Sequence, residues 1–182
     1  MRILIIGAGK VGSSVAGNLV SESNDITIVD TNKAKMCIRA SQGIVGDATS
    51  PSVLADAGAV DADMIIAVTA NDETNLAVTL IAEQLFNVPS RIARVRNDEL
   101  REYPALLSTS GFRATSVIWP EEAITNYIVQ LITYPEALQV IEFSDGDVVL
   151  MSVKIVSSSK MCGRPVSALQ DELPRVKVQI VS

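Results

Sequence analysis

Residues 1–12 read MRILIIGAGKVG, a short apolar run that leads directly into a GxGxxG pattern. The first glycine of such a pattern permits a tight turn, the second lets backbone approach a pyrophosphate, and the third allows a helix to lie against the strand. The pattern alone is weak evidence, because glycines also mark ordinary turns. Here a strand precedes it, a helix follows, and Asp30 closes the next strand 18 residues after Gly12. The sequence therefore predicts a diphosphate site at the N-terminus of the first helix.

The same alternation of strands and helices continues along the chain. Continuous apolar runs favour strands that are buried on both faces, as in a parallel sheet. Six strands alternating with helices predict an α/β fold over residues 1–134, a Rossmann-like doubly wound parallel sheet. The strands are expected at 3–6, 26–29, 44–45, 64–68, 92–95 and 116–118, and the helices near 11–21, 32–42, 51–57, 73–86, 98–108 and 120–131.

The pattern changes after residue 134. Apolar runs at 138–143 and 148–155 flank a turn rich in Asp and Gly, which predicts a β-hairpin. A short helix near 166–169 and a last apolar run at 176–181 are expected to follow. We interpret residues 135–182 as the start of a small β-rich C-terminal regulatory module that is truncated or completed by another chain. The alternative is a complete small appendage packed on the first domain.

The composition excludes several classes of function. None of the 182 residues is a histidine, which rules out histidine-dependent triads, a histidine general base and His-rich zinc sites. Cys37 and Cys162 lie 125 positions apart, too far for a CxxC redox pair, and isolated cysteines suit a reducing compartment.

The lengths of the apolar runs bear on the cellular location of the protein, and its net charge bears on its binding partners. No run is long enough for a signal peptide or a spanning helix, so we expect a cytoplasmic protein with no direct membrane insertion. A net charge of −6, the lack of a basic block and 4% aromatic residues argue against nucleic acid as a partner.

Asp30 indicates which nucleotide the predicted site takes. A carboxylate at this place can accept both ribose hydroxyls of an adenosine and would repel a 2′-phosphate. The next residues, Thr31 and Asn32, supply no arginine for such a phosphate. NAD(H), or another adenosine nucleotide with a free ribose such as ATP or ADP, is therefore favoured over NADP(H). The alternative is that Asp30 only caps a helix that starts near Asn32.

Other residues are expected in the same crevice, because ligands bind outside the carboxyl ends of the strands at the switch point. Residues 46–49 would border the adenine, and residues 69–72 would line the nicotinamide or phosphate side. Arg91, Arg94 and Arg96 surround the fifth strand; Arg94 and Arg96 share a face and either meet one anion or are simply solvated. The predicted cofactor-binding residues are Gly7, Gly9, Lys10, Val11, Gly12, Asp30, Asp47, Ala48, Thr69, Asn71, Asp72 and Arg94, with no catalytic or metal-binding residue.

The sequence offers a nucleotide site without catalytic groups beside it. A dehydrogenase commonly uses histidine or a Tyr-x-x-x-Lys pair, but leucine stands four residues after each of Tyr103, Tyr127 and Tyr134. No P-loop pattern is present either. We therefore favour a nucleotide sensor that is not an enzyme. The alternatives are a small NAD-dependent oxidoreductase with a carboxylate base such as Asp72, and a redox-sensing DNA-binding repressor, which would need a basic helix-turn-helix.

Several segments resemble the TrkA family of Trk-type potassium-uptake regulators, which belong to the regulators of potassium conductance (the RCK/KTN nucleotide-binding family). The resemblance implies a cytosolic regulatory subunit that binds NAD(H), or ATP and ADP. Bound nucleotide would alter a homodimeric or tetrameric ring and so gate a membrane-embedded potassium transporter subunit, which would hold the protein at the inner face of the membrane. The segments are 6–12, 24–30, 61–64, 69–75, 91–96 and 134–140.

The resemblance also implies roles for individual residues. The helix at 120–131 would serve in dimer assembly, and Arg94 would reach nucleotide phosphates, in some members across a subunit boundary. Family members usually carry a complete C-terminal module, and many repeat the entire pair, so the chain is expected to be a fragment. The other implied roles are the phosphate loop for Gly7, Gly9, Lys10 and Gly12, the ribose carboxylate for Asp30, and the nucleotide cleft for Asp47, Thr69, Asn71 and Asp72.

Overall fold

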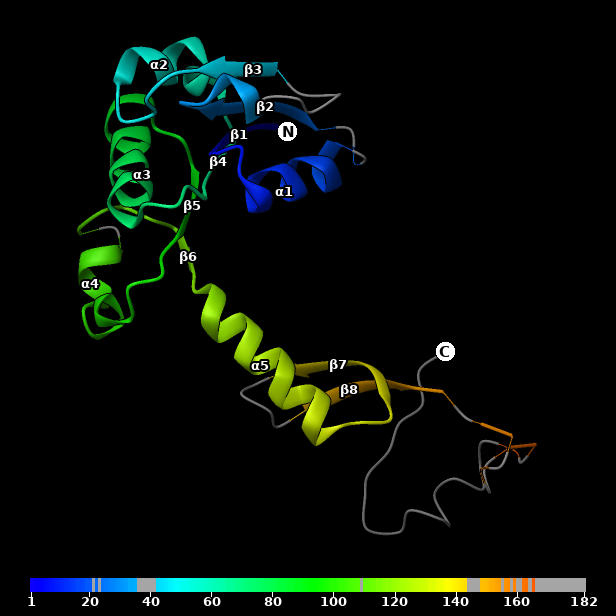
Figure 1. Ribbon diagram of the computed structural model, residues 1–182. Coiled ribbons are helices and arrows are strands. Elements are labelled where there is room, and N and C mark those ends of the chain that lie inside the picture. The colour runs from blue at the N-terminus through cyan, green and yellow to red at the C-terminus, as the bar shows by residue number, and fades with distance from the viewer. Residues whose placement is uncertain are drawn as a thin grey trace. The chain divides into compact units, whose positions relative to one another are not determined.

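The computed structural model contains two compact units, Met1–Ile124 and Thr125–Ser182 (Figure 1). The division falls inside a helix, and the domain boundary predicted after residue 134 stays a prediction. The structure describes residues 1–20, 22, 24–35, 42–108, 110–143, 148–154, 156, 157, 159, 162, 163 and 165.

The first unit is built on a six-stranded sheet in which every neighbouring pair of strands is parallel. The order β3-β2-β1-β4-β5-β6 confirms the predicted Rossmann-like doubly wound fold. It reverses direction between β1 and β4, so the carboxyl ends of these two strands form the switch point. The strands are β1 Arg2–Ile6, β2 Asp25–Asp30, β3 Gln42–Val45, β4 Met64–Ala67, β5 Ser90–Arg94 and β6 Ser116–Ile118.

Helices cover both faces of this sheet. Successive side chains of a strand point to opposite faces. Ile5 therefore packs in a cluster with Ala16 of α1 (Lys10–Val20), whereas Ile6 packs in another with Leu54 of α2 (Pro51–Asp56) and Val78 of α3 (Asp72–Phe86). All five side chains are at most 1% exposed. Burying each of the larger ones contributes about 1.5–3 kcal/mol relative to exposure.

The helices of the middle region agree only partly with the sequence. The single helix expected near 98–108 is wrong: the structure has a 3-10 helix, η3 Asp98–Glu102, and then α4 Pro104–Leu107. Pro104 separates them because proline lacks an N–H and restricts the residue before it. The expected helix near 32–42 is represented by a 3-10 turn, η1 Lys33–Lys35, and residues 36–41, Cys37 among them, lie outside the described residues. Another 3-10 turn, η2 Ala59–Asp61, follows α2.

The second unit contains the predicted hairpin. Helix α5 (Pro120–Thr133) leads into β7 (Ala137–Phe143), which pairs antiparallel with β8 (Val148–Val153). The turn at 144–147, the helix expected near 166–169 and the run expected at 176–181 lie outside the described residues. Within the described part of the chain, no helix combines the length and hydropathy needed to cross a bilayer.

Gly12 gives a test of the packing between α1 and β1. A Cβ atom at Gly12 would lie 1.8 Å from the carbonyl oxygen of Gly7, so Gly12→Ala must push the helix off the strand. We expect it to lower the free energy of unfolding by about 1–3 kcal/mol, the usual cost of overpacking. Gly17→Ala is the matched control in the same helix. Nothing lies within 4 Å of its Cβ position, so it should stabilise by roughly 0.5–1 kcal/mol. Equal denaturation midpoints for the two variants would contradict this account.

Candidate functional site

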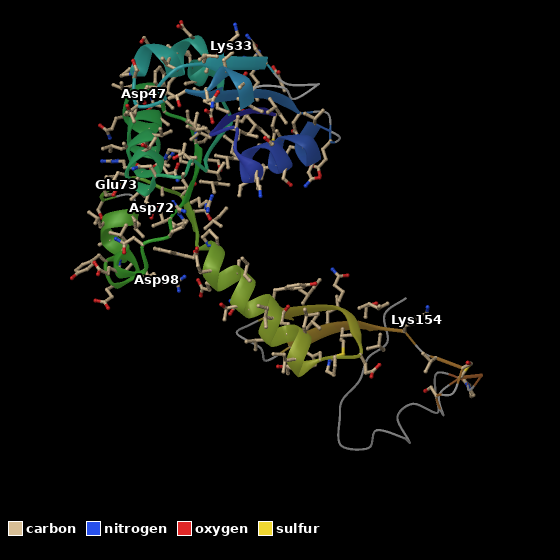
Figure 2. The ribbon with its side chains drawn as sticks, viewed as in Figure 1. Lys33, Asp47, Asp72, Glu73, Asp98 and Lys154 are labelled. Atoms are coloured by element: carbon tan, nitrogen blue, oxygen red, sulfur yellow. The ribbon has the colours of Figure 1, made fainter. Side chains whose placement is uncertain are left out.

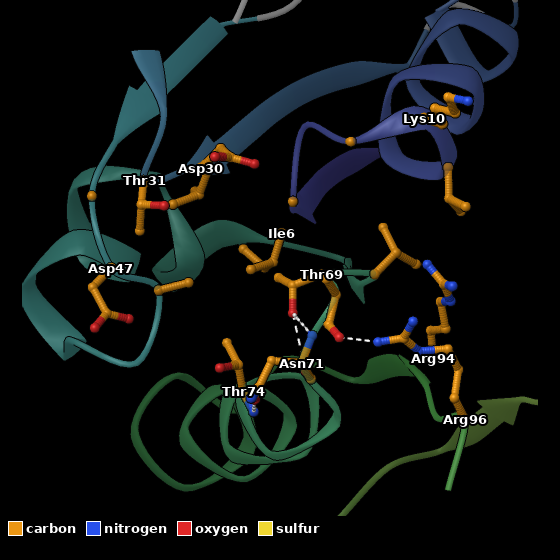
Figure 3. A pocket seen from close by; sticks show the side chains of 18 residues that line it. Ile6, Lys10, Asp30, Thr31, Asp47, Thr69, Asn71, Thr74, Arg94 and Arg96 are labelled. Atoms are coloured by element: carbon orange, nitrogen blue, oxygen red, sulfur yellow. Dashed lines mark hydrogen bonds between the residues drawn. The ribbon is translucent and has the colours of Figure 1, made fainter. Parts of the chain in front are cut away.

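A pocket of about 670 Å³ opens at the carboxyl ends of the central strands, beside the first turn of α1 (Figure 3). Its walls come from the glycine loop, the ends of β2 and β3, the loop between β4 and α3, and the end of β5. Of the twelve residues predicted to bind a cofactor, only Gly12 and Asp72 do not line it. Those that do are Gly7, Gly9, Lys10, Val11, Asp30, Asp47, Ala48, Thr69, Asn71 and Arg94.

The three glycines of the loop have distinct roles. Gly7 has φ +104°, a conformation that side chains disfavour, and its N–H donates to the carbonyl oxygen of Val29 at 2.8 Å. Gly9 has no atom within 4 Å of its Cβ position, so it leaves the pocket side of the loop open. Gly12 is buried beneath the loop, against the Gly7 carbonyl. Gly7 and Gly12 have the turn and packing roles that the GxGxxG spacing predicts, and the close approach of a pyrophosphate to Gly9 stays a prediction.

Asp30 connects the end of β2 to the glycine loop. Its Oδ2 accepts a hydrogen bond from the Ala8 N–H at 2.7 Å, and its Oδ1 accepts one from the Asn32 N–H at 2.8 Å. The bond to Asn32 agrees with the capping alternative, and the bond to Ala8 adds a role in holding the loop. Each carboxylate oxygen has more than one acceptor site, so capacity for ribose hydroxyls remains. The carboxylate therefore organises the pocket wall while it still faces the pocket.

Asp47 adds a second carboxylate to the same half of the pocket. Its Oδ1 accepts from the Thr49 N–H at 2.9 Å and from the Thr49 hydroxyl at 2.8 Å. The backbone N–H of Thr49, with the hydroxyl as a smaller contribution, holds the pKa of the Asp47 carboxyl below its ordinary value. Asp47 is therefore ionised at neutral pH.

Three basic side chains line the other half of the pocket: Lys10, Arg94 and Arg96. Figure 3 shows them across the pocket from Asp30, Thr31 and Asp47. The guanidinium of Arg96 donates to the carbonyl oxygen of Ala70. The Nε of Arg94 is buried and has no hydrogen-bond partner among the described residues.

A buried N–H without an acceptor costs free energy, so the Arg94 Nε is a place where an anion would be stabilised. The pocket thus has an acidic half, suited to hydroxyl and amino donors, and a basic half, suited to phosphates.

The loop between β4 and α3 forms the floor between these halves. The Thr69 hydroxyl lies 2.7 Å from the Asn75 Oδ1 and 3.0 Å from the Asn71 carbonyl oxygen, so its single proton is used within the protein. The Asn71 side chain accepts from the Thr74 N–H and caps α3. Thr74 and Asn75 fall within the segment 69–75 that carries the family resemblance, but the sequence patterns gave neither of them a role.

Besides Gly12, two residues that the sequence placed at the site do not line the pocket, Asp72 and Arg91. Asp72 sits with Glu73 at the N-terminal end of α3 (Figure 2). Its Oδ2 accepts from the N–H groups of Arg96 and Asn97 at 2.8 and 2.9 Å, so it fixes the segment after β5 instead of lining the pocket. A carboxylate base would have to face the pocket, so this geometry does not support Asp72 as the base of the oxidoreductase alternative.

Arg91 is buried away from the pocket, with 7% of its surface exposed. Its guanidinium donates to the carbonyl oxygens of Val88, Pro89 and Arg113, the last at 2.7 Å. Because residues alternate along β5, Arg91 points to the face opposite Arg94. It holds two loops of the fold together.

Residues 3–120 match the family model for the TrkA-N domain. The chain is also 31% identical to a Trk system potassium uptake protein TrkA homolog from Methanothermobacter thermautotrophicus, over all of this chain and 82% of that protein. The chain belongs to the TrkA family. This confirms the resemblance found in the sequence.

Other TrkA relatives are longer than this chain. The Trk system potassium uptake protein TrkA of Vibrio alginolyticus is 43% identical over the whole of this chain and 41% of its own length. The one from Haemophilus influenzae is 42% identical with the same coverage. The chain thus spans about two-fifths of these relatives.

Solved structures share the fold of this TrkA-family chain. The TrkA-N domain of the Escherichia coli inner membrane protein ybaL aligns with TM-score 0.63 at 19% identity, over 72% of this chain and 96% of that one. GsuK bound to ADP aligns with TM-score 0.62 at 26% identity, over 74% of this chain and 34% of that one.

Asp30 gives a direct test of the acidic half of the pocket. Asp30→Ala removes the carboxylate that holds Ala8 and faces the ribose position, so we expect ADP affinity to fall about tenfold, the loss of one charge-assisted hydrogen bond. Asp25→Ala is the matched control, since Asp25 begins the same strand and lies at its amino end, whereas the pocket opens at the carboxyl ends of the strands. Isothermal titration calorimetry measures both dissociation constants. An unchanged constant for Asp30→Ala would mean that the carboxylate only holds Ala8 and caps the following turn, and contributes nothing to ribose binding.

Proposed function

We propose that this chain is the nucleotide-sensing part of a potassium-uptake regulatory subunit. The observation that carries the proposal is the charge-divided pocket around the glycine loop. Membership of the TrkA family supplies the connection to potassium uptake. The name of a solved relative in this fold, GsuK bound to ADP, supports an adenosine nucleotide as ligand.

In this proposal the ligand lies across the switch point with its adenosine toward Asp30 and Asp47. The ribose hydroxyls donate to Asp30, which also disfavours a 2′-phosphate. The diphosphate meets the N–H groups at the start of α1, where the helix dipole favours negative charge. The β-phosphate of this diphosphate, and any phosphate beyond it, also meets Lys10, Arg94 and Arg96.

The basic half of the pocket also predicts an order of affinity among the nucleotides. Each further phosphate brings negative charge toward three cations, so ATP and ADP bind more tightly than AMP. Of the dinucleotides, NADH binds more tightly than NAD⁺, because the oxidised nicotinamide ring is itself a cation. NAD(H) and ATP/ADP thus both fit as effectors, and the pocket favours the more negative member of each pair.

Regulation then requires that the nucleotide favour one conformation of an assembly over another, since a ligand shifts an equilibrium only by its differential affinity. Helix α5 offers a surface for homodimer or tetramer assembly: Ile124, Ile128 and Ile132 recur at helical spacing and are 60%, 48% and 74% exposed. The assembly would act on a membrane-embedded potassium translocation subunit and so lie at the inner, cytoplasmic face of the membrane. The nucleotide is bound and released without chemical change.

Calorimetry with AMP, ADP, ATP, NAD⁺ and NADH tests the proposal. We expect ADP to bind about tenfold more tightly than AMP, the contribution of one guanidinium–phosphate hydrogen bond. Arg94→Gln should remove that advantage. Arg101→Gln, which removes the same charge outside the pocket, should preserve it.

The particle mass from sedimentation, measured with and without ADP, should differ if nucleotide controls assembly. Failure of all five ligands to bind would contradict a nucleotide sensor, and an unchanged mass would contradict control of assembly.

A further inference from the structure

Asn75, in the second turn of α3, is a fully buried polar side chain that does not line the pocket. Its Oδ1 accepts from the N–H and the hydroxyl of Thr69, at 2.9 and 2.7 Å. Its Nδ2 donates to the carbonyl oxygen of Arg94 at 2.8 Å and to that of Thr69 at 3.3 Å. The carboxamide thus uses both its acceptor sites and both its N–H groups.

These bonds connect two strands beyond the point where their own pairing stops. The ladder between β4 and β5 ends at Ala67 and Ala93. Asn75 continues the connection to Thr69 and Arg94, both of which line the pocket. On its other side, the Thr69 backbone lies against the glycine loop, since a Cβ at Gly7 would be 3.1 Å from the Thr69 Cα.

A second side chain of the same helix holds the segment that follows. Asp72 lies three residues before Asn75, on the same face of α3. It accepts from the N–H groups of Arg96 and Asn97. The start of α3 therefore fixes the backbone at Arg94, Arg96 and Asn97, the segment that carries two of the three basic side chains of the pocket.

We propose that Asn75 is a positioning residue for nucleotide phosphates, acting through Arg94. It sets the place and direction in which the Arg94 side chain leaves β5, because it fixes the carbonyl group of that residue. It also fixes Thr69, the surface on which the phosphate loop packs. The proposal rests on the proposed function. It makes the discrimination between ADP and AMP by Arg94 depend on Asn75, a buried residue that touches neither nucleotide.

If Asn75 served only to stabilise the fold, its replacement would be expected to have a different effect. A buried carboxamide that only stabilises the fold lowers stability when it is replaced, because the backbone groups that it paired are left without partners, but it leaves the ratio of nucleotide affinities unchanged. Neighbouring buried positions of α3 are filled by Leu76 and Val78. A positioning residue instead changes the phosphate-dependent part of the affinity when it is replaced, even in protein that remains folded.

The test compares Asn75→Leu, which keeps the approximate volume, with Asn75→Ser, whose shorter hydroxyl cannot span both strands. Thr79→Val is the matched control: Thr79 is fully buried in the same helix, and its hydroxyl bonds to the carbonyls of Leu76 and Phe112 outside the pocket. The measured quantity is the ratio of the AMP and ADP dissociation constants, from calorimetry at a temperature where thermal unfolding shows each variant folded.

We expect the roughly tenfold preference for ADP to fall to about twofold or less in both Asn75 variants, and to persist in Thr79→Val. In protein that already carries Arg94→Gln, Asn75→Ser should change the ratio no further, because its effect passes through Arg94. A preserved ratio in a folded Asn75 variant would overturn the proposal. If wild-type protein binds neither nucleotide, the proposed function fails first, so the two failures are distinguishable.

Discussion

The close approach of Gly12 to the carbonyl oxygen of Gly7 is the contact on which the rest of the site depends. Only a hydrogen atom fits at the Gly12 position, so α1 begins directly over the end of β1. That placement aims the unpaired N–H groups of the first turn at the switch point. Gly7 in turn packs on the backbone of Thr69, which lets the loop from β4 form the opposite wall.

Charge separation across the pocket follows from the order of the strands. The half-sheet with β2 and β3 ends in Asp30 and Asp47, and the half with β5 ends in Arg94 and Arg96. A ligand that spans the switch point therefore passes from an acidic to a basic environment. A nucleoside polyphosphate has the matching distribution, with hydroxyl and amino donors at one end and anionic oxygens at the other.

Features that depend on local spacing could be predicted from the sequence. The glycine loop, the strand that ends at Asp30 and the helices beginning near Pro51 and Asp72 each follow from a short pattern of residues. Pro104 marks a break inside the expected helix, because the residue before a proline disfavours the helical conformation.

Features that depend on the direction of a side chain across more distant segments could not be predicted. The sequence places Asp72 and Arg91 close to pocket residues. Their side chains instead bond to backbone groups of other segments, which lie as far as 25 residues away along the chain. Asn75 gave one signal, a polar residue among the apolar positions of a helix, but its partner Arg94 is 19 residues distant.

The most direct test of the whole account is the NMR signal of the Arg94 Nε–H during titration with ADP. The account predicts that this signal shifts and exchanges more slowly with solvent as phosphate becomes its acceptor. Saturable ADP binding that leaves this signal unchanged would contradict it.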